Sequence, residues 1–180
     1  MARVMAELIR QTEMLHEGYP AAPSGLSAKA SALDADAIWQ RMESYIAWRF
    51  SLRTVEWIVE GRGAWSPPLG PATITSTEVW QNDAWATVPL TPSPLGGFVL
   101  PCCAPYRIIG TVGEDDAEVP AIVQEAWRRL AEYLAAVVVK PGVRTESVPD
   151  VWQGEYDNRA VAKALQDSGA ADLLRRFRRV

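Results

Sequence analysis

The sequence contains very little of what enzymes most often use for acid–base catalysis or metal binding. Its 180 residues include one histidine, His16, and two cysteines, Cys102 and Cys103. One histidine leaves no Cys/His set with the spacing of a zinc site. A disulfide between adjacent cysteines would be strained and could not join distant parts of the fold. We therefore expect no structural metal and a reducing compartment.

Motifs of nucleotide-binding and hydrolytic enzymes are also missing. The chain has neither a phosphate-binding loop ending in Gly-Lys-Ser/Thr nor a Gly-x-Ser-x-Gly nucleophile elbow. Glu114, Asp115, Asp116 and Glu118 could hold a divalent cation, but carboxylates ahead of a helix also favour its positive N-terminal end. We favour the second role and predict no catalytic residues, no cofactor and no metal. A metal-dependent enzyme built on this cluster is the alternative.

Long apolar runs are absent too. The longest uninterrupted one covers residues 133–139, far below the roughly 20 residues that a membrane-spanning helix needs. Near the N-terminus, Glu7 and Arg10 interrupt the apolar run that a secretory signal would require. We expect no membrane association and a protein that stays in the cytoplasm where it is made.

What the sequence does contain is an apolar share of 48% and eight tryptophans, which are typical of a chain that buries a core. Its charge is unevenly distributed. Residues 1–158 carry 12 Lys/Arg against 20 Asp/Glu, a net charge of −8, whereas residues 159–180 carry 6 against 2, a net charge of +4. An acidic body disfavours nucleic acid bound over the main surface, because Lys and Arg supply most non-specific affinity for phosphate.

Two segments have strong helical periodicity, and residues 1–16 have a weaker one. The first strong helix is predicted from Asp34 or Asp36 to about residue 53, and the second follows Pro120 and ends before Pro141-Gly142. Two short helices, at residues 157–166 and 170–179, are predicted to be separated at Ser168-Gly169. The apolar positions of the strong helices recur at intervals of three and four: Ile38, Trp39, Met42, Tyr45, Ile46 and Phe50, then Ala126, Trp127, Leu130 and Leu134.

Between the strong helices the periodicity changes to short β-prone runs bounded by Pro and Gly. These runs are residues 55–59, 73–80, 84–88, 97–100 and 106–112, and Asn82-Asp83 could close a two-residue hairpin. The predicted fold class is therefore α+β: a helical bundle of two long helices plus shorter ones, with a small β insertion at about 54–112. Residues 1–140 would form the body, and residues 141–180 an extended C-terminal arm ending in a short helix.

The basic C-terminus is the candidate binding element. Its apolar residues Leu173, Leu174, Phe177 and Val180 fall at helical spacing, with Arg175, Arg176, Arg178 and Arg179 between them. Such a segment either docks in a groove of a neighbouring protein or folds back on its own body with the arginines in solvent. We expect docking, because an extended segment separates the tail from the core helices.

Taken in order, four parts of the chain resemble the head–tail connector (adaptor) proteins of tailed double-stranded DNA phages and gene transfer agents. The resemblance covers about residues 34–180. Its parts are Asp34-Ala35-Asp36-Ala37-Ile38 opening a helix, Glu78-Val79-Trp80-Gln81-Asn82-Asp83-Ala84-Trp85 in the β insertion, Val119-Pro120 before the second helix, and Leu173-Leu174-Arg175-Arg176-Phe177-Arg178-Arg179 at the end.

The resemblance implies a structural virion protein of the neck, assembled in the host cytoplasm. Such a protein forms a homo-oligomeric ring, expected to be a dodecamer, that binds the portal protein on one side and a stopper or tail-side neck protein on the other. DNA passes through the ring without sequence-specific binding, and the tail residues would face the portal. The alternatives are another neck component, a stopper or tail terminator, which are usually mostly β, or a small regulatory binding module with a basic tail.

Overall fold

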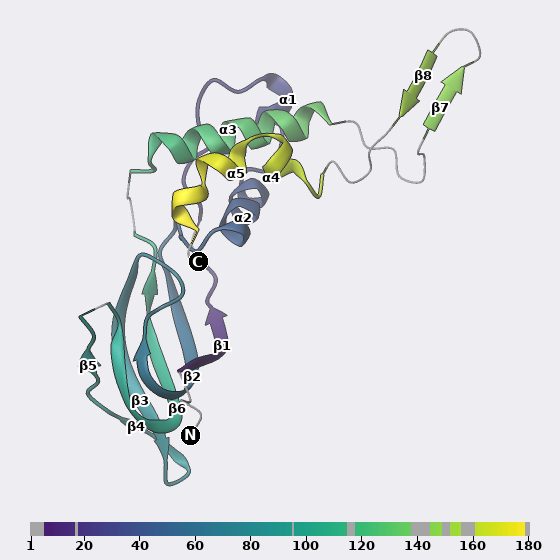
Figure 1. Cartoon of the computed structure of the whole chain (residues 1–180). Helices are drawn as coiled ribbons and strands as arrows, with labels where there is room; N and C mark the ends of the chain where they lie inside the picture. Colours follow the sequence, from purple (N-terminus) through teal and green to yellow (C-terminus); the bar gives the residue numbers. More distant parts are fainter. Residues whose placement is uncertain are drawn as a thin grey trace. The chain divides into compact units, whose positions relative to one another are not determined.

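The computed structural model describes residues 6–16, 18–94, 96–114, 118–137, 145–148, 152–155 and 161–178 (Figure 1). The chain divides into two compact units. The first, here called the sheet unit, is drawn from Met1–Tyr19 and Ala47–Ala117, and the second, the helical unit, from Pro20–Ile46 and Glu118–Val180. The larger part of the sheet unit, Ala47–Ala117, is therefore inserted into the sequence of the helical unit.

The sheet unit is an antiparallel sheet of six strands in the order β1-β2-β6-β3-β4, with β5 pairing with one end of β6. The two central strands are also the longest (Figure 1). The strand bounds are β1 Glu7–Glu13, β2 Arg53–Trp65, β3 Ala72–Gln81, β4 Ala84–Thr87, β5 Thr91–Pro92 and β6 Phe98–Val112.

Strict alternation explains why β2 and β6 pair as they do. Val55, Trp57 and Val59 are fully buried, while the residues between them face the other side of the sheet. Trp57 lies opposite Ile108 and Val59 opposite Tyr106, so the buried faces of the two strands coincide. A one-residue shift would expose all of these side chains, and the register is therefore fixed by burial.

The turn predicted at Asn82-Asp83 is confirmed. Gln81 pairs with Ala84, and both turn residues have positive φ, 51° at Asn82 and 60° at Asp83, as a type I′ hairpin turn requires. Beside the turn, the rings of Trp80 and Trp85 pack edge to face with centroids 5.2 Å apart. The β3–β4 hairpin is thus fixed by its turn and by an aromatic cross-strand pair.

The helical unit combines two longer helices with several single-turn helices: α1 Ala28–Ser31, α2 Ala35–Tyr45, α3 Ala121–Ala136, α4 Ala164–Asp167, α5 Ala170–Leu173 and a 3-10 turn at Arg175–Phe177. Asp34 caps α2 by accepting hydrogen bonds from the backbone of Asp36 and Ala37. The indoles of Trp39 in α2 and Trp127 in α3 meet with ring centroids 6.4 Å apart, and both are almost fully buried. Strands β7 (Thr145–Val148) and β8 (Trp152–Glu155) form a separate antiparallel pair.

The predicted fold class is wrong, because the six-stranded antiparallel sheet is the dominant element and not a small insertion into a helical bundle. Among the described residues only α2 and α3 exceed seven residues, with 11 and 16. The first helix ends at Tyr45 because Ile46 is already extended, so Phe50 and Leu52 lie outside it. The β-prone runs at 97–100 and 106–112 are parts of one 15-residue strand, β6.

The helix predicted at residues 1–16 is also wrong within the described residues. Glu7–Glu13 forms β1, which pairs with β2 along its whole length. Pairing to an existing strand provides backbone hydrogen bonds and a neighbour for each side chain, which outweighs a weak helical periodicity. Of the segments predicted near the C-terminus, the break at Ser168-Gly169 is confirmed, with Gly169 at φ 74° between α4 and α5. Residues 156–160, the start of the helix predicted at 157–166, lie outside the described residues.

Candidate functional site

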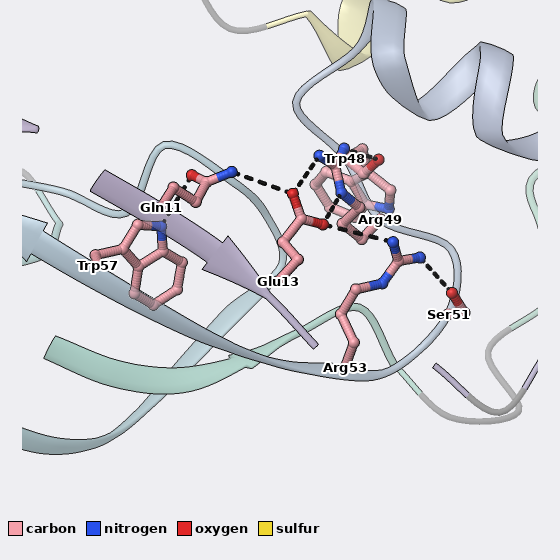
Figure 2. Close-up of polar contacts among 7 residues, drawn as sticks. All are labelled: Gln11, Glu13, Trp48, Arg49, Ser51, Arg53 and Trp57. Atoms are coloured by element: carbon pink, nitrogen blue, oxygen red, sulfur yellow. Dashed lines mark hydrogen bonds and ion pairs between the residues drawn. The ribbon is translucent and has the colours of Figure 1, made fainter. Parts of the chain in front are cut away.

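A cluster of charged and polar side chains joins β1 to the start of β2, and we call it the clasp: Gln11, Glu13, Arg49, Ser51, Arg53 and Trp57 (Figure 2). At its centre, Glu13 accepts hydrogen bonds from Arg49 Nε at 2.7 Å and from Arg49 Nη2 at 2.9 Å. Arg53 Nη1 lies 3.4 Å from the same carboxylate. The bidentate geometry fixes the position of the last residue of β1.

The clasp extends along β1 through Gln11. The Gln11 side chain donates to Glu13 at 3.1 Å and accepts from the indole N–H of Trp57 at 3.0 Å. On the other side, Arg53 donates to the hydroxyl of Ser51 (Figure 2). A buried tryptophan in the sheet core is therefore linked by hydrogen bonds to the edge strand.

The electrostatics of the clasp favour the charged form of Glu13. Partial burial raises the pKa of this carboxyl group. Hydrogen bonds from Arg49 and the Gln11 amide, together with the positive charges of Arg49 and Arg53, outweigh that effect and lower the pKa overall. Arginine keeps its proton at any physiological pH. The clasp thus acts as an ion-pair anchor for β1 and not as a proton-transfer site.

The strand that the clasp holds presents apolar side chains to solvent. Ile9 is 55% exposed and lies in a β-bulge between Leu8 and Arg10, where the register with β2 shifts. Just after the strand, Met14 is 57% exposed and Leu15 is fully exposed.

The face of the sheet opposite the core carries charges paired across strands. Arg10 of β1 bonds Glu56 of β2 at 2.8 Å, and Arg107 of β6 bonds Glu78 of β3. The Arg107 guanidinium also lies over the Trp85 ring, 4.9 Å from its centroid. These contacts tie neighbouring strands together; the Arg10–Glu56 pair is of the solvent-exposed kind that stabilises weakly, whereas the Arg107–Glu78 pair is partly buried.

The C-terminal residues predicted as the docking element lie in the helical unit. Leu174 is fully buried, Phe177 is 8% exposed and Leu173 is half-buried, and α5 packs against α3. Arg175, Arg176 and Arg178 are exposed. Arg178 donates to the Tyr45 hydroxyl at 3.1 Å and stacks on its ring, and Arg176 lies over the ring of Phe177. Arg179 and Val180 lie outside the described residues.

This placement corresponds to the folded-back alternative for Leu174 and Phe177, whose side chains are core residues of the helical unit in this conformation. The exposed arginines between and after these two residues form a basic surface, called here the arginine face: Arg175, Arg176 and Arg178. The docking role of the segment stays a prediction, and the accessible part of it is the arginine face.

The remaining candidates from the sequence are not brought together. Cys102 and Cys103 are exposed and lie where three residues of β6 oppose a single residue of β2 between Gly61 and Gly63. The buried Tyr106 hydroxyl contacts Cys102 there, and burial raises the pKa of Tyr106 to about 12.

The residues that the structure describes contain no group of three or more His, Cys, Asp or Glu side chains placed to hold a metal. Asp115 and Asp116 of the acidic cluster lie outside those residues. None of the described helices is long and apolar enough to cross a bilayer.

Sequence reasoning missed the clasp, because its members are distant in the chain. Glu13 is 36 residues from Arg49 and 40 from Arg53. The one local indication is the pair Arg49 and Arg53 at the start of β2. This pair becomes informative only when β1 is recognised as a strand. No family model matches the chain, and no curated protein or solved structure matches it.

Proposed function

We propose that the protein is a structural subunit of the neck of a tailed virus or gene transfer agent. In this proposal it is a head–tail connector that assembles as a ring, binds the portal on one side and the next neck or tail protein on the other, and surrounds passing DNA. The observation that carries the proposal is the arginine face, a basic surface built on a buried anchor at the end of an otherwise acidic chain.

The anchor makes the arginine face a suitable docking surface. Because Leu174 and Phe177 are buried, the backbone that carries the arginines is ordered before any partner binds, and less conformational entropy is lost on binding. Guanidinium groups pair with carboxylates and backbone carbonyls in defined geometry. An acidic surface on a portal ring would meet these requirements, and the repeated contact around a ring would add avidity.

The order of elements also supports the proposal. The parts on which the resemblance rests form, in chain order, a capped helix that starts after Asp34, a strand pair around Trp80 and Trp85, a helix after Pro120 and a basic C-terminus. The excess of carboxylates in residues 1–158 would let DNA pass a ring without sticking to it, since like charges repel.

The test is a charge reversal that leaves the buried anchor intact. Arg175→Glu combined with Arg176→Glu should fold normally but lower the affinity for the portal at least about tenfold. Particles assembled with the variant should be heads without tails, counted by electron microscopy. Lys163→Glu combined with Arg62→Glu changes the same charge at exposed positions outside the arginine face and should leave tails attached. Normal tail attachment by the Arg175/Arg176 variant would refute portal docking by this surface.

A stopper or tail terminator is the second candidate, and the six-stranded antiparallel sheet favours it because such neck proteins are mostly β. The two candidates differ in their partner. A connector binds isolated portal rings directly, whereas a stopper or terminator binds only when another neck protein is present. Co-sedimentation with portal alone separates them.

A further inference from the structure

Two exposed thiols, those of Cys102 and Cys103, follow one another on β6 where this strand leaves its regular pairing. The β6 residues on either side of them, Leu100 and Ala104, pair with β2 residues that are only two positions apart. Residues 101–103 therefore form a β-bulge, in which β6 has more residues than the strand beside it.

The bulge removes a restriction that a regular strand would impose on the two sulfur atoms. Successive side chains of a regular strand point to opposite faces of the sheet, which keeps adjacent thiols apart. Along residues 106–112 of β6, buried and half-buried residues alternate strictly, whereas residues 101–103 are all exposed. The extra residues give the backbone at the bulge room to turn while the pairs on both sides of it stay formed.

A buried tyrosine holds the first of the two cysteines. The Tyr106 hydroxyl accepts a hydrogen bond from the Cys102 amide at 3.3 Å, donates to the Cys102 carbonyl at 3.1 Å and lies 3.1 Å from its Sγ atom. Tyr106 is fully buried and belongs to the core of the sheet unit. A change at the Cys102 sulfur therefore acts directly on a core side chain.

We propose that the bulge makes Cys102 and Cys103 a reversible redox site, in which a peroxide converts the two thiols into a disulfide within one chain. The sequence contains no other cysteine that could compete as an intrachain partner. The site belongs to the sheet unit and the arginine face to the helical unit, so the redox site goes beyond the proposed connector function and does not depend on it.

One equivalent of hydrogen peroxide supplies the oxidant. One thiolate attacks the peroxide, so that an S–O bond forms, the O–O bond breaks and one molecule of water leaves after proton transfer. The neighbouring thiol then attacks the sulfenic sulfur, so that the S–S bond forms, the S–O bond breaks and a second water leaves. The two thiols lose two electrons and two protons in all, and the peroxide is reduced to two waters.

The adjacency of the two cysteines also makes the product easy to reduce. A disulfide between neighbouring residues is strained, and strained disulfides are the labile ones. A small-molecule thiol returns the site to the dithiol by exchange. The disulfide is thus suited to a transient response to oxidant and not to holding the fold together.

Intact-mass spectrometry of the full chain tests the site. The reduced protein is treated with one equivalent of hydrogen peroxide in the absence of denaturant. The monomer should become lighter by the mass of two hydrogen atoms, and a thiol reductant should restore the original mass. Peptide mapping should place the loss at Cys102 and Cys103.

Single-thiol variants are the controls. Cys102→Ser and Cys103→Ser each keep one thiol and should gain oxygen atoms or form covalent dimers, without a monomer that has lost two hydrogen atoms. If the natural chain behaves in the same way and yields no lighter monomer, the redox site is refuted.

A second pair of cysteines tests the role of the bulge. In a Cys102→Ser, Cys103→Ser background, Ala86→Cys combined with Thr87→Cys places adjacent thiols on β4, whose pairing with β3 is regular. This pair should react like the single-thiol variants, because its side chains point to opposite faces of the sheet. Intrachain disulfide formation as complete on β4 as in the natural chain would overturn the proposal that the bulge creates the site.

Discussion

The sheet unit and the helical unit are stabilised by different means. The sheet unit comes mostly from one continuous stretch, Ala47–Ala117, and its strands are held by backbone pairing in a register fixed by burial. The helical unit is assembled from segments on both sides of that stretch, and four of its elements are single turns of three or four residues. Helices this short are not stable alone, so packing must hold them.

Both units nevertheless use a tryptophan pair in the core. In the sheet unit the rings of Trp57 and Trp65 are 5.9 Å apart, and in the helical unit those of Trp39 and Trp127 are 6.4 Å apart. The difference is in what surrounds the pair. Strands that neighbour one another surround the first, whereas the second lies in a unit to which the C-terminal segment contributes the buried Leu174 and Phe177. The tail is thus a structural part of the helical unit.

The largest expected effect comes from removing that tail. Truncation after Ser168 deletes the buried Leu174 and Phe177, each worth roughly 1.5 to 3 kcal/mol of burial, and exposes apolar surface of α3. We expect the helical unit to lose most of its stability while the sheet unit stays folded. Hydrogen exchange measures this directly: α3 amides should lose protection, and β2 and β6 amides should keep it.

A point substitution gives the same comparison in milder form. Leu174→Ala should destabilise the helical unit by about 2 to 5 kcal/mol, and Leu173→Ala, at a half-buried position, by clearly less. If α3 remains as protected in the truncated chain as in the full chain, the tail is not part of the core of this unit.

The next effect in size belongs to the sheet unit and its clasp. Glu13→Gln leaves Arg49 and Arg53, whose side chains are 10% and 7% exposed, without their shared carboxylate. We expect a loss of about 1 to 3 kcal/mol in the free energy of unfolding, measured by urea denaturation. Glu56→Gln is the matched control, because the Arg10–Glu56 pair is more exposed and should contribute less than about 1 kcal/mol.

The pH dependence of the clasp follows from the lowered pKa of Glu13. A carboxyl group whose pKa is lower in the folded state stabilises the fold above its unfolded pKa, and this contribution is lost as the pH falls through its folded pKa. The stability difference between the natural chain and Glu13→Gln should therefore be full at neutral pH and shrink on acidification. A difference that does not change with pH would show that the charge of Glu13 is not what anchors β1.

The sequence-based predictions succeeded where structure is set by neighbouring residues. The capped start of α2 after Asp34, the start of α3 after Pro120 and the turn at Asn82-Asp83 all depend on contacts within a few residues. Each was therefore visible in the sequence, although the turn uses Asn-Asp and not the more favourable Asn-Gly.

The predictions failed where structure is set by distant residues. β1 is a strand because β2 lies beside it, and residues 101–105 belong to β6 although two prolines occur there. The candidate site, too, could be predicted only where it depends on neighbouring residues. The arginines of the C-terminus were identified, but the burial of Leu174 depends on α3, and the clasp joins residues 36 and 40 positions apart.

The smallest expected effect concerns the hairpin that forms one edge of the sheet. Asp83 has φ 60°, a conformation that a non-glycine residue adopts at a cost. Asp83→Gly should relieve this cost and stabilise the sheet unit by a few tenths to about 1 kcal/mol, with no effect on the helical unit. Thermal unfolding followed at Trp80 and Trp85, beside the turn, detects the change.

Asp36→Gly is the contrasting substitution, because Asp36 is in the first turn of α2. This substitution should lower the stability of the helical unit only. If Asp83→Gly destabilises the sheet unit, the aspartate side chain contributes to the turn more than its backbone strain costs.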